Sequence, residues 1–243
     1  MPPAACTPPR ATARPGRPTR QARGPSRLVY LVDRDALGPA GDRRAPCSAD
    51  STTDRSLLPP DPQPQYLARG PLAVFGPYSD RYGQGDWAKM RTTPAYFRRA
   101  DGSSVLFVSG STRAAEASTV AVPPGVARLR IATSPGEPAY LALDGSEDDV
   151  AFLSPGSPVI SSNGVADAVV WVLDANLPRS GRLVGADVPH PVLYAFDADT
   201  LQLLWRSAPD QLAVGGKYNT PAIAHGLVLV GTDRIQAFGL AAD

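Results

Sequence analysis

The feature that most constrains the fold is a short, Pro-led apolar segment that occurs three times at nearly equal spacing. Pro94, Pro158 and Pro221 each follow a Thr or a Ser, and they lie 64 and 63 residues apart. Each segment leads through a turn into a longer run of β-branched and other apolar residues, which is the pattern of a β-hairpin. Self-similarity at a fixed period predicts an array of similar units, each built of strands.

Composition also favours strands joined by many loops. Proline accounts for 27 of the 243 residues, about twice its usual share of ~5%. Proline interrupts long helices because it lacks the backbone N–H donor. A chain of this length can bury a substantial core as one domain. No apolar run approaches the ~18 residues that a membrane-spanning helix needs, so we expect no membrane span.

Further strands can be placed around the three hairpins. We expect a leading strand within residues 27–35 and a returning strand at 72–75, and later strands at 127–133, 139–143, 191–206 and 234–240. The count gives two full units of four antiparallel strands with the Pro-led strand innermost, a leading half unit, and a last unit without its outer strand. A closed β-propeller usually has four to eight such blades. Residues 27–243 are therefore predicted to form an all-β, incomplete β-propeller of about three to three and a half blades.

The most specific motif is the hairpin PVLYAFDADTLQLLWRSAP at residues 191–209. Apolar residues fill both alternating faces of its first strand, residues 197–200 supply turn chemistry, and the second strand carries Trp205 near its end. This hairpin resembles the repeat of the quinoprotein family, the pyrroloquinoline-quinone-type β-propellers. The apolar strand with its terminal aspartate recurs at residues 28–33, and YNTPAIAHG with VGTD, near the end of the chain, resembles the closing blade of such proteins.

The resemblance covers the chain from residue 27 onward and implies an extracytoplasmic location. The superfamily includes quinone-dependent alcohol and sugar dehydrogenases and also catalytically inert scaffold proteins of cell envelopes. We expect a non-catalytic quinoprotein-like propeller, or a fragment of one, that serves binding or assembly. The alternative is the C-terminal portion of a quinone-dependent alcohol or sugar dehydrogenase, for which the resemblance implies pyrroloquinoline quinone (PQQ) and calcium as cofactors.

Two residue patterns bear on these alternatives. The best-known alcohol-oxidising members place a vicinal Cys-Cys disulfide beside the quinone, whereas Cys6 and Cys47 are far apart in this chain and are expected to be unpaired. Those members also hold a calcium ion with acidic and amide groups, because a hard cation needs several oxygen ligands. Asp197 and Asp199 offer suitable oxygens, but their place in a blade turn favours turn capping.

No Ser-His-Asp, zinc or phosphate-loop pattern is evident, and we predict neither catalytic residues nor a metal site. The acidic run at residues 147–149 follows Asp144 and Gly145, and we interpret it as a solvated loop. His190 lies between two prolines, and His225 precedes a turn glycine. Either histidine could act as a base, but both are interpreted as turn residues.

The three tryptophans receive different interpretations. In the family, a buried Trp at a strand end locks one blade to the next, with its N–H bonded to the neighbouring blade, and we expect this role for Trp205. Trp171 lies in an apolar strand and is predicted to belong to the core. Trp87 lies in a Gly-rich segment before the first Pro-led strand and is the most plausible aromatic residue to face a ligand.

Candidate binding residues precede two of the Pro-led strands. In propellers these loops open onto one mouth of the central channel, so their side chains are expected to converge there. Because each loop carries a cation, an anion-accepting funnel is one interpretation. The other is that the side chains extend over the rim and bind nothing. The channel-mouth candidates are Trp87, Lys89, Arg91, Lys217, Tyr218 and Asn219.

Charge is distributed unevenly along the chain. Six arginines and no acid occur in residues 1–32, so a formal net charge of +1 leaves the rest at −5. Residues 1–26 have no hydrophobic period and are predicted to be a disordered Arg/Pro-rich tail. A nucleic-acid-binding arm is conceivable, but we favour a linker or translated sequence upstream of the real start, and expect no nucleic-acid partner. The tail lacks the apolar stretch of a signal peptide.

An incomplete propeller would leave blade edges exposed. Exposed edges favour association with other propeller segments or other proteins. We therefore expect the chain not to be a complete functional unit, and it would be consistent with a fragment of a longer reading frame.

Overall fold

The structure is a computed structural model that describes residues 29–31, 73–75, 92–111, 125–133, 135, 139–147, 149–177, 188–216 and 219–239. The Arg/Pro-rich tail of residues 1–26 and both cysteines lie outside these ranges. Throughout the described ranges the secondary structure is β, with thirteen strands and no helix. The prediction of an all-β chain is confirmed.

The strands form four antiparallel sheets that follow one another along the chain, here numbered 1 to 4. Sheet 1 contains β1 (Val29–Leu31) and β2 (Ala73–Phe75). Sheet 2 contains β3 (Ala95–Arg98), β4 (Ser104–Ser109), β5 (Val126–Ala132) and β6 (Tyr140–Glu147). Sheet 3 contains β7 (Val159–Asn163), β8 (Ala166–Asp174), β9 (Val192–Asp197) and β10 (Leu203–Arg206). Sheet 4 contains β11 (Ala222–Ala224), β12 (Leu227–Gly231) and β13 (Ile235–Phe238).

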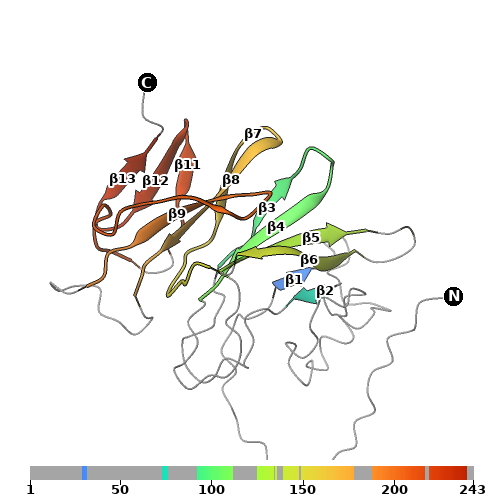
Figure 1. The fold of residues 1–243 in the computed structure, drawn as a ribbon, viewed down its shortest axis with the longest axis horizontal. Helices are drawn as coiled ribbons and strands as arrows, with labels where there is room; N and C mark the ends of the chain where they lie inside the picture. Colours follow the sequence, from blue (N-terminus) through green and yellow to red (C-terminus); the bar gives the residue numbers. More distant parts are fainter. Residues whose placement is uncertain are drawn as a thin grey trace, which may run out of the picture.

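Every strand pairs with its neighbour in the sequence, so each sheet is a meander. The expected two-, four-, four- and three-stranded sequence of sheets is present, with the Pro-led strand first in each of sheets 2 to 4. Figure 1 shows the sheets in one row, from blue and teal through green and yellow to red. Within the described residues this row is open and does not close into a ring, so the propeller itself remains a proposal.

Apolar side chains fill the space between consecutive sheets. The core between sheets 2 and 3 is the largest, and it contains Val105, Phe107, Phe152, Val170 and Phe196. A second cluster joins sheets 1 and 2, and a third joins sheets 3 and 4. Strand β9 is covered on both faces, as its apolar sequence predicts. Burying an apolar side chain of this size contributes about 1.5–3 kcal/mol to stability. Packing of apolar side chains between the faces of consecutive sheets therefore holds the sheets together.

The pairing registers of sheets 3 and 4 correspond residue by residue. Across sheet 3, Ile160, Val170 and Phe196 are paired in one row, and they face sheet 2. Across sheet 4 the equivalent row is Ile223, Val228 and Phe238, which faces sheet 3. Consecutive sheets therefore present the same side to the sheet before them.

The last strand of each four-stranded sheet also carries an irregularity at the same place. In sheet 2 the register shifts at Asp144, between the pairs of Arg128 with Gly145 and Leu129 with Leu143. In sheet 3 the register shifts at Leu204, between the pairs of Phe196 with Leu203 and Ala195 with Trp205. A β-bulge bends an edge strand and interrupts its pairing groups, so both four-stranded sheets end in a bulged edge.

The first strands of the sheets are neighbours. Strand β7 contacts β3 on one side and β11 on the other. The backbone N–H of Thr93 donates to the Ser157 hydroxyl at 2.8 Å, which joins equivalent positions of two Pro-led segments. Gly156 lies so close to Asn219 that a Cβ at this position would collide with the Asn219 carbonyl. The Pro-led segments are thus brought together at one junction.

Two expectations need correction. Strand β6 continues through Asp144 and Gly145, and Glu147 at its end is only 7% exposed. Glu147 is therefore not part of a solvated loop: its Oε1 accepts the N–H groups of Asp149 and Val150, which caps the turn after β6. Trp205 is 39% exposed and not buried, because it lies on β10, the exposed edge strand of sheet 3.

Candidate functional site

The junction of the Pro-led segments is the place where the channel-mouth candidates were expected. Trp87, Lys89, Arg91, Lys217 and Tyr218 lie outside the described residues, so their convergence stays a prediction. Asn219 is described, and its Nδ2 donates to the carbonyl of Gly231 at 2.6 Å. This bond ties the start of β11 to the end of β12, which gives Asn219 a structural role.

The hydroxyl groups at this junction bind backbone carbonyls of the protein. Thr92 Oγ1 donates to the Ser109 carbonyl at 2.7 Å, and Ser109 Oγ donates to the Gly156 carbonyl at 2.8 Å. Buried polar groups are normally paired in this way because an unpaired group is costly. Short Ser and Thr side chains allow strands of two sheets to approach each other closely. The Ser109 hydroxyl therefore joins sheet 2 to the segment that leads into sheet 3, whereas Thr92 ties the start of β3 to the end of β4 within sheet 2.

The densest charged group surrounds Arg128 on β5. Its Nη1 reaches across to sheet 3 and donates to the carbonyls of Ala198 and Asp199, at 2.8 and 2.6 Å. Its Nε and Nη2 donate to the carboxylate and the carbonyl of Asp144, both at 2.8 Å. Arg99 Nη1 binds the same carboxylate at 3.0 Å, and its Nε forms an ion pair with Asp199 at 3.1 Å. We call this group the arginine clamp.

Asp197 and Asp199, whose oxygens were considered as calcium ligands, lie at the turn between β9 and β10, and both are engaged in contacts within the protein. Oδ1 of Asp197 accepts the N–H groups of Asp199 and Thr200 and the Thr200 hydroxyl, at 2.7–3.0 Å. Partial burial would raise the pKa of Asp197, but these hydrogen bonds outweigh it and lower the pKa. The side chain caps the turn, as predicted, and Asp199 belongs to the arginine clamp. Among the described residues no group of three or more potential metal ligands is present.

A buried carboxylate, Asp174, lies at the end of β8. It is 1% exposed, and its two oxygens accept the N–H groups of Leu153, Ser154 and Asn176 at 2.7–3.1 Å. Burial raises the pKa of Asp174, although the three hydrogen bonds act in the opposite direction. Burial, and then the charge of Asp174, also raise the pKa of Tyr194. Asp174 organises the segment that leads into sheet 3.

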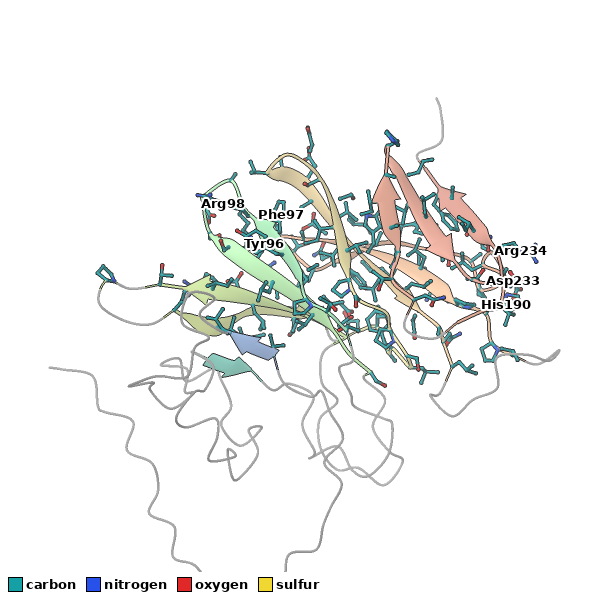
Figure 2. All side chains as sticks on the ribbon, turned by 180° about the vertical axis from the view of Figure 1, so that it is seen from behind. Tyr96, Phe97, Arg98, His190, Asp233 and Arg234 are labelled. Carbon is teal, nitrogen blue, oxygen red and sulfur yellow. The ribbon has the colours of Figure 1, made fainter. Side chains whose placement is uncertain are left out.

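The two histidines make no catalytic pair in the described structure. His190 Nδ1 lies 2.6 Å from the carbonyl of Leu212; since a carbonyl can only accept, Nδ1 carries the hydrogen. His225 is exposed and has a φ of 51° beside Gly226 in the β11–β12 turn, as expected of a turn residue. Figure 2 shows His190 at the same end of the molecule as the Asp233–Arg234 ion pair.

Aromatic rings connect the edge of sheet 3 with sheet 4. Trp205 and Trp171 are paired with the same residue, Ala195, from opposite sides, and their rings meet at 6.4 Å over this small side chain. The Trp205 ring also lies 5.8 Å from that of Phe238 on β13. Trp205 thus contacts the next sheet through its ring, but it is not buried as expected, and the expected hydrogen bond from its N–H to that sheet stays a prediction. Trp171 is half-buried and donates its Nε1 hydrogen to Ser161.

The face of sheet 4 that points away from sheet 3 was not among the candidate sites expected from the sequence. Leu229 and Ala237 are paired on this face, as are Gly231 and Ile235, and Ile235 is 79% exposed. All of the side chains that register places here are apolar or absent, and we call this surface the outer face. Its signal in the sequence was the unbroken apolar run of β12, which is typical of a strand covered on both sides. The outer face comprises Ala222, Ala224, Leu227, Leu229, Gly231, Ile235 and Ala237.

Comparison with protein-family models, with curated proteins and with solved structures finds no match. The quinoprotein resemblance therefore rests on the residues quoted above. No helix long and apolar enough to cross a membrane occurs in the part of the chain that the structure describes.

Proposed function

We propose that the protein is a non-catalytic, quinoprotein-like propeller segment that serves assembly outside the cytoplasm. The observation that carries this proposal is the outer face of sheet 4. The corresponding faces of sheets 2 and 3 are each covered by the next sheet, whereas this one is apolar and no further described sheet covers it. Apolar surface of this kind, gathered on one sheet, is typical of an interaction site.

The partner that fits the outer face is another antiparallel sheet of the same type. In sheets 3 and 4, the side facing the preceding sheet carries a row of large apolar residues: Ile160, Val170 and Phe196 in one, and Ile223, Val228 and Phe238 in the other. A sheet presenting such a row would continue the stacking with the geometry of the two existing interfaces. The charged side chains of Asp233 and Arg234 lie in the adjoining turn and pair with each other.

The polar groups support assembly more than catalysis. Asp197 caps a turn, Arg128 and Asp199 join two sheets, and Asp174 holds a backbone segment. A quinone dehydrogenase would need acidic and amide oxygens that are free to converge on a calcium ion. The described acidic groups with these contacts are engaged within the protein, which favours the scaffold over the dehydrogenase alternative.

Self-association provides the test of the outer face. Because the apolar rows that begin with Ile160 and Ile223 are already packed within one copy, two copies would associate by stacking their outer faces on each other. Leu229→Glu and Ile235→Asp each place a charge on it, whereas Arg130→Glu changes an exposed residue of sheet 2 and serves as the control. Light scattering after size-exclusion chromatography should show concentration-dependent association of the wild type and the control, and its loss in both outer-face variants. A wild type that stays a compact, stable monomer at all concentrations would contradict the proposal.

Enzyme activity provides the second test. After addition of PQQ and calcium, a dye-linked assay with alcohols and sugars should give no turnover above the protein-free rate. Turnover that requires both cofactors would instead establish the dehydrogenase alternative.

A further inference from the structure

We infer that the free edge of β13 is a docking site for an extended segment of a partner protein, which pairs antiparallel to it as the fourth strand of sheet 4. The inference deepens the proposed assembly function and rests on it, but it concerns a different surface. Stacking uses the outer face of sheet 4, whereas this site uses the edge of its last strand. Addition of a strand to an exposed edge is a common mode of peptide recognition.

The first argument is the strand count. Sheets 2 and 3 have four strands in the same meander order, and sheet 4 has three. Strand β13 has the position of β5 and β9, the third strands of sheets 2 and 3. Those strands are paired on both edges, with β4 and β6 or with β8 and β10. Strand β13 pairs with β12, and no described strand pairs with its other edge.

The second argument is the regularity of this edge. The outermost strands of sheets 2 and 3 carry bulges at Asp144 and Leu204. Bulges of this kind are one way in which proteins protect edges from further pairing. The β12–β13 pairing runs from Gly231 with Ile235 to Val228 with Phe238 without a shift. Of the last strands of sheets 2, 3 and 4, β13 is therefore the one whose edge is regular.

The third argument is the exposure of Trp205. The ring meets Phe238 on one side, and 39% of the residue remains exposed. Leu203 and Leu204, beside it on β10, are 42% and 56% exposed. A strand added to β13 would place a residue directly opposite Phe238 and on the same face, since opposite residues of an antiparallel pair share a face. An apolar side chain at that position would continue the Trp171–Trp205–Phe238 cluster.

The register of sheet 2 suggests what such a strand looks like. Leu129 occupies the position of Phe238, and its partner on the fourth strand is Leu143. We therefore expect the partner segment to be uncharged at this position and to be without proline. The peptide YLALDGSE, which copies residues 140–147, meets these conditions and contains no tryptophan, so it is a suitable probe.

Hydrogen–deuterium exchange of the full chain with and without this peptide is the decisive measurement. At saturating peptide, exchange should slow by about tenfold or more in β13, with little change in β6 and β10. The same peptide with N-methyl groups on alternate residues retains its side chains but cannot form the ladder, and it should not protect β13. Protection of β6 or β10 in place of β13, equal protection by the methylated peptide, or no protection at ~1 mM peptide would overturn the inference.

Two variants distinguish this site from the outer face. Leu229→Glu should abolish stacking but leave peptide affinity unchanged, because Leu229 lies on β12 with its side chain on the outer face. Trp205→Ala should lower the affinity for the peptide by about 3- to 10-fold, which is the range expected for the loss of one aromatic contact. If β13 is protected without peptide as protein concentration rises, and Leu229→Glu leaves that protection intact, a second copy occupies the edge and the inferred peptide partner is wrong. If the peptide binds as expected while PQQ-dependent turnover appears, the assembly function fails and the docking site stands.

Discussion

Replacing Arg128 with methionine tests whether a polar contact between sheets contributes as much as the apolar core. The guanidinium is buried, and it donates four hydrogen bonds, two to carbonyls of sheet 3 and two to Asp144. Methionine is similar in length and keeps apolar contacts of the stem, but it leaves those acceptors without their donor. Removing one partner of a buried ion pair costs about 3–5 kcal/mol. Since Asp144 keeps its contact with Arg99, we expect the lower end, about 3 kcal/mol.

A matched control exists in the same strand. Arg130 is two residues further along β5, on the same side of the sheet, and it is exposed. Arg130→Met removes the same charge and adds the same side chain, but exposed substitutions usually change stability by less than ~0.5 kcal/mol. Arg128→Lys keeps the charge and removes the planar array of donors, so it should recover only part of the loss.

Urea denaturation followed by circular dichroism measures both effects. With a slope of ~2 kcal/mol per molar urea, the Arg128→Met midpoint should fall by about 1–2 M, and the Arg130→Met midpoint by less than ~0.3 M. Equal midpoints for the two methionine variants would refute the argument that the buried hydrogen bonds stabilise the interface. Full recovery by lysine would show that charge alone, and not the four-bond geometry, is responsible.

Three further predictions concern the core and the edge. Phe152 is fully buried and edge-on to Tyr194 at 5.1 Å, so Phe152→Ala should cost about 3–5 kcal/mol in urea unfolding and Phe152→Leu less than half of that; a silent Ala variant would contradict the sheet 2–3 core. Because burial raises the pKa of Asp174, the folded state binds its proton more tightly than the unfolded state, and the stability of the wild type relative to Asp174→Asn should fall as the pH rises through the folded pKa. The opposite slope, measured by urea unfolding between about pH 3 and 8, would show that the three hydrogen bonds outweigh burial. Trp205 is 39% exposed, so Trp205→Ala should cost about 2–3 kcal/mol, less than a fully buried aromatic residue, and a denaturant midpoint as low as that of Phe152→Ala would mean that the ring is covered in solution.

Strand order could be predicted from the sequence because it depends on local signals. The Pro-led segments, the turn chemistry and the apolar periods each specify a strand or a hairpin over a few residues. Sequential hairpins then determine the meander, which is why sheets 2, 3 and 4 were expected with four, four and three strands. The covered strand β9 was recognisable for the same reason, since apolar residues on both alternating faces are a local property.

Contacts between sheets could not be predicted, because they depend on which residues meet across an interface. Glu147 reads as part of an acidic loop, and only the continuation of β6 past the bulge at Asp144 brings it into a buried position. Arg128 sits in a strand of five apolar residues and two arginines, and its two acceptors on sheet 3 are about 70 residues away along the chain. Trp205 was expected to be buried because the hairpin motif indicates only the strands of its own sheet. The motif carries no information on how much of the tryptophan the next sheet covers.

The two main interfaces differ in a way that bears on function. Sheets 2 and 3 are joined by the largest apolar core, by the Thr93–Ser157 and Ser109–Gly156 hydrogen bonds, and by the arginine clamp. The described contacts between sheets 3 and 4 include a smaller apolar cluster, the Trp205–Phe238 ring contact and the approach of β7 to β11, and no equivalent of the arginine clamp is described between them. Local opening is cheapest where fewer buried contacts must be broken. Sheet 4 is therefore the element that a partner would stabilise most, and under the proposed assembly function a partner that covered its outer face and extended its edge would do both in one step.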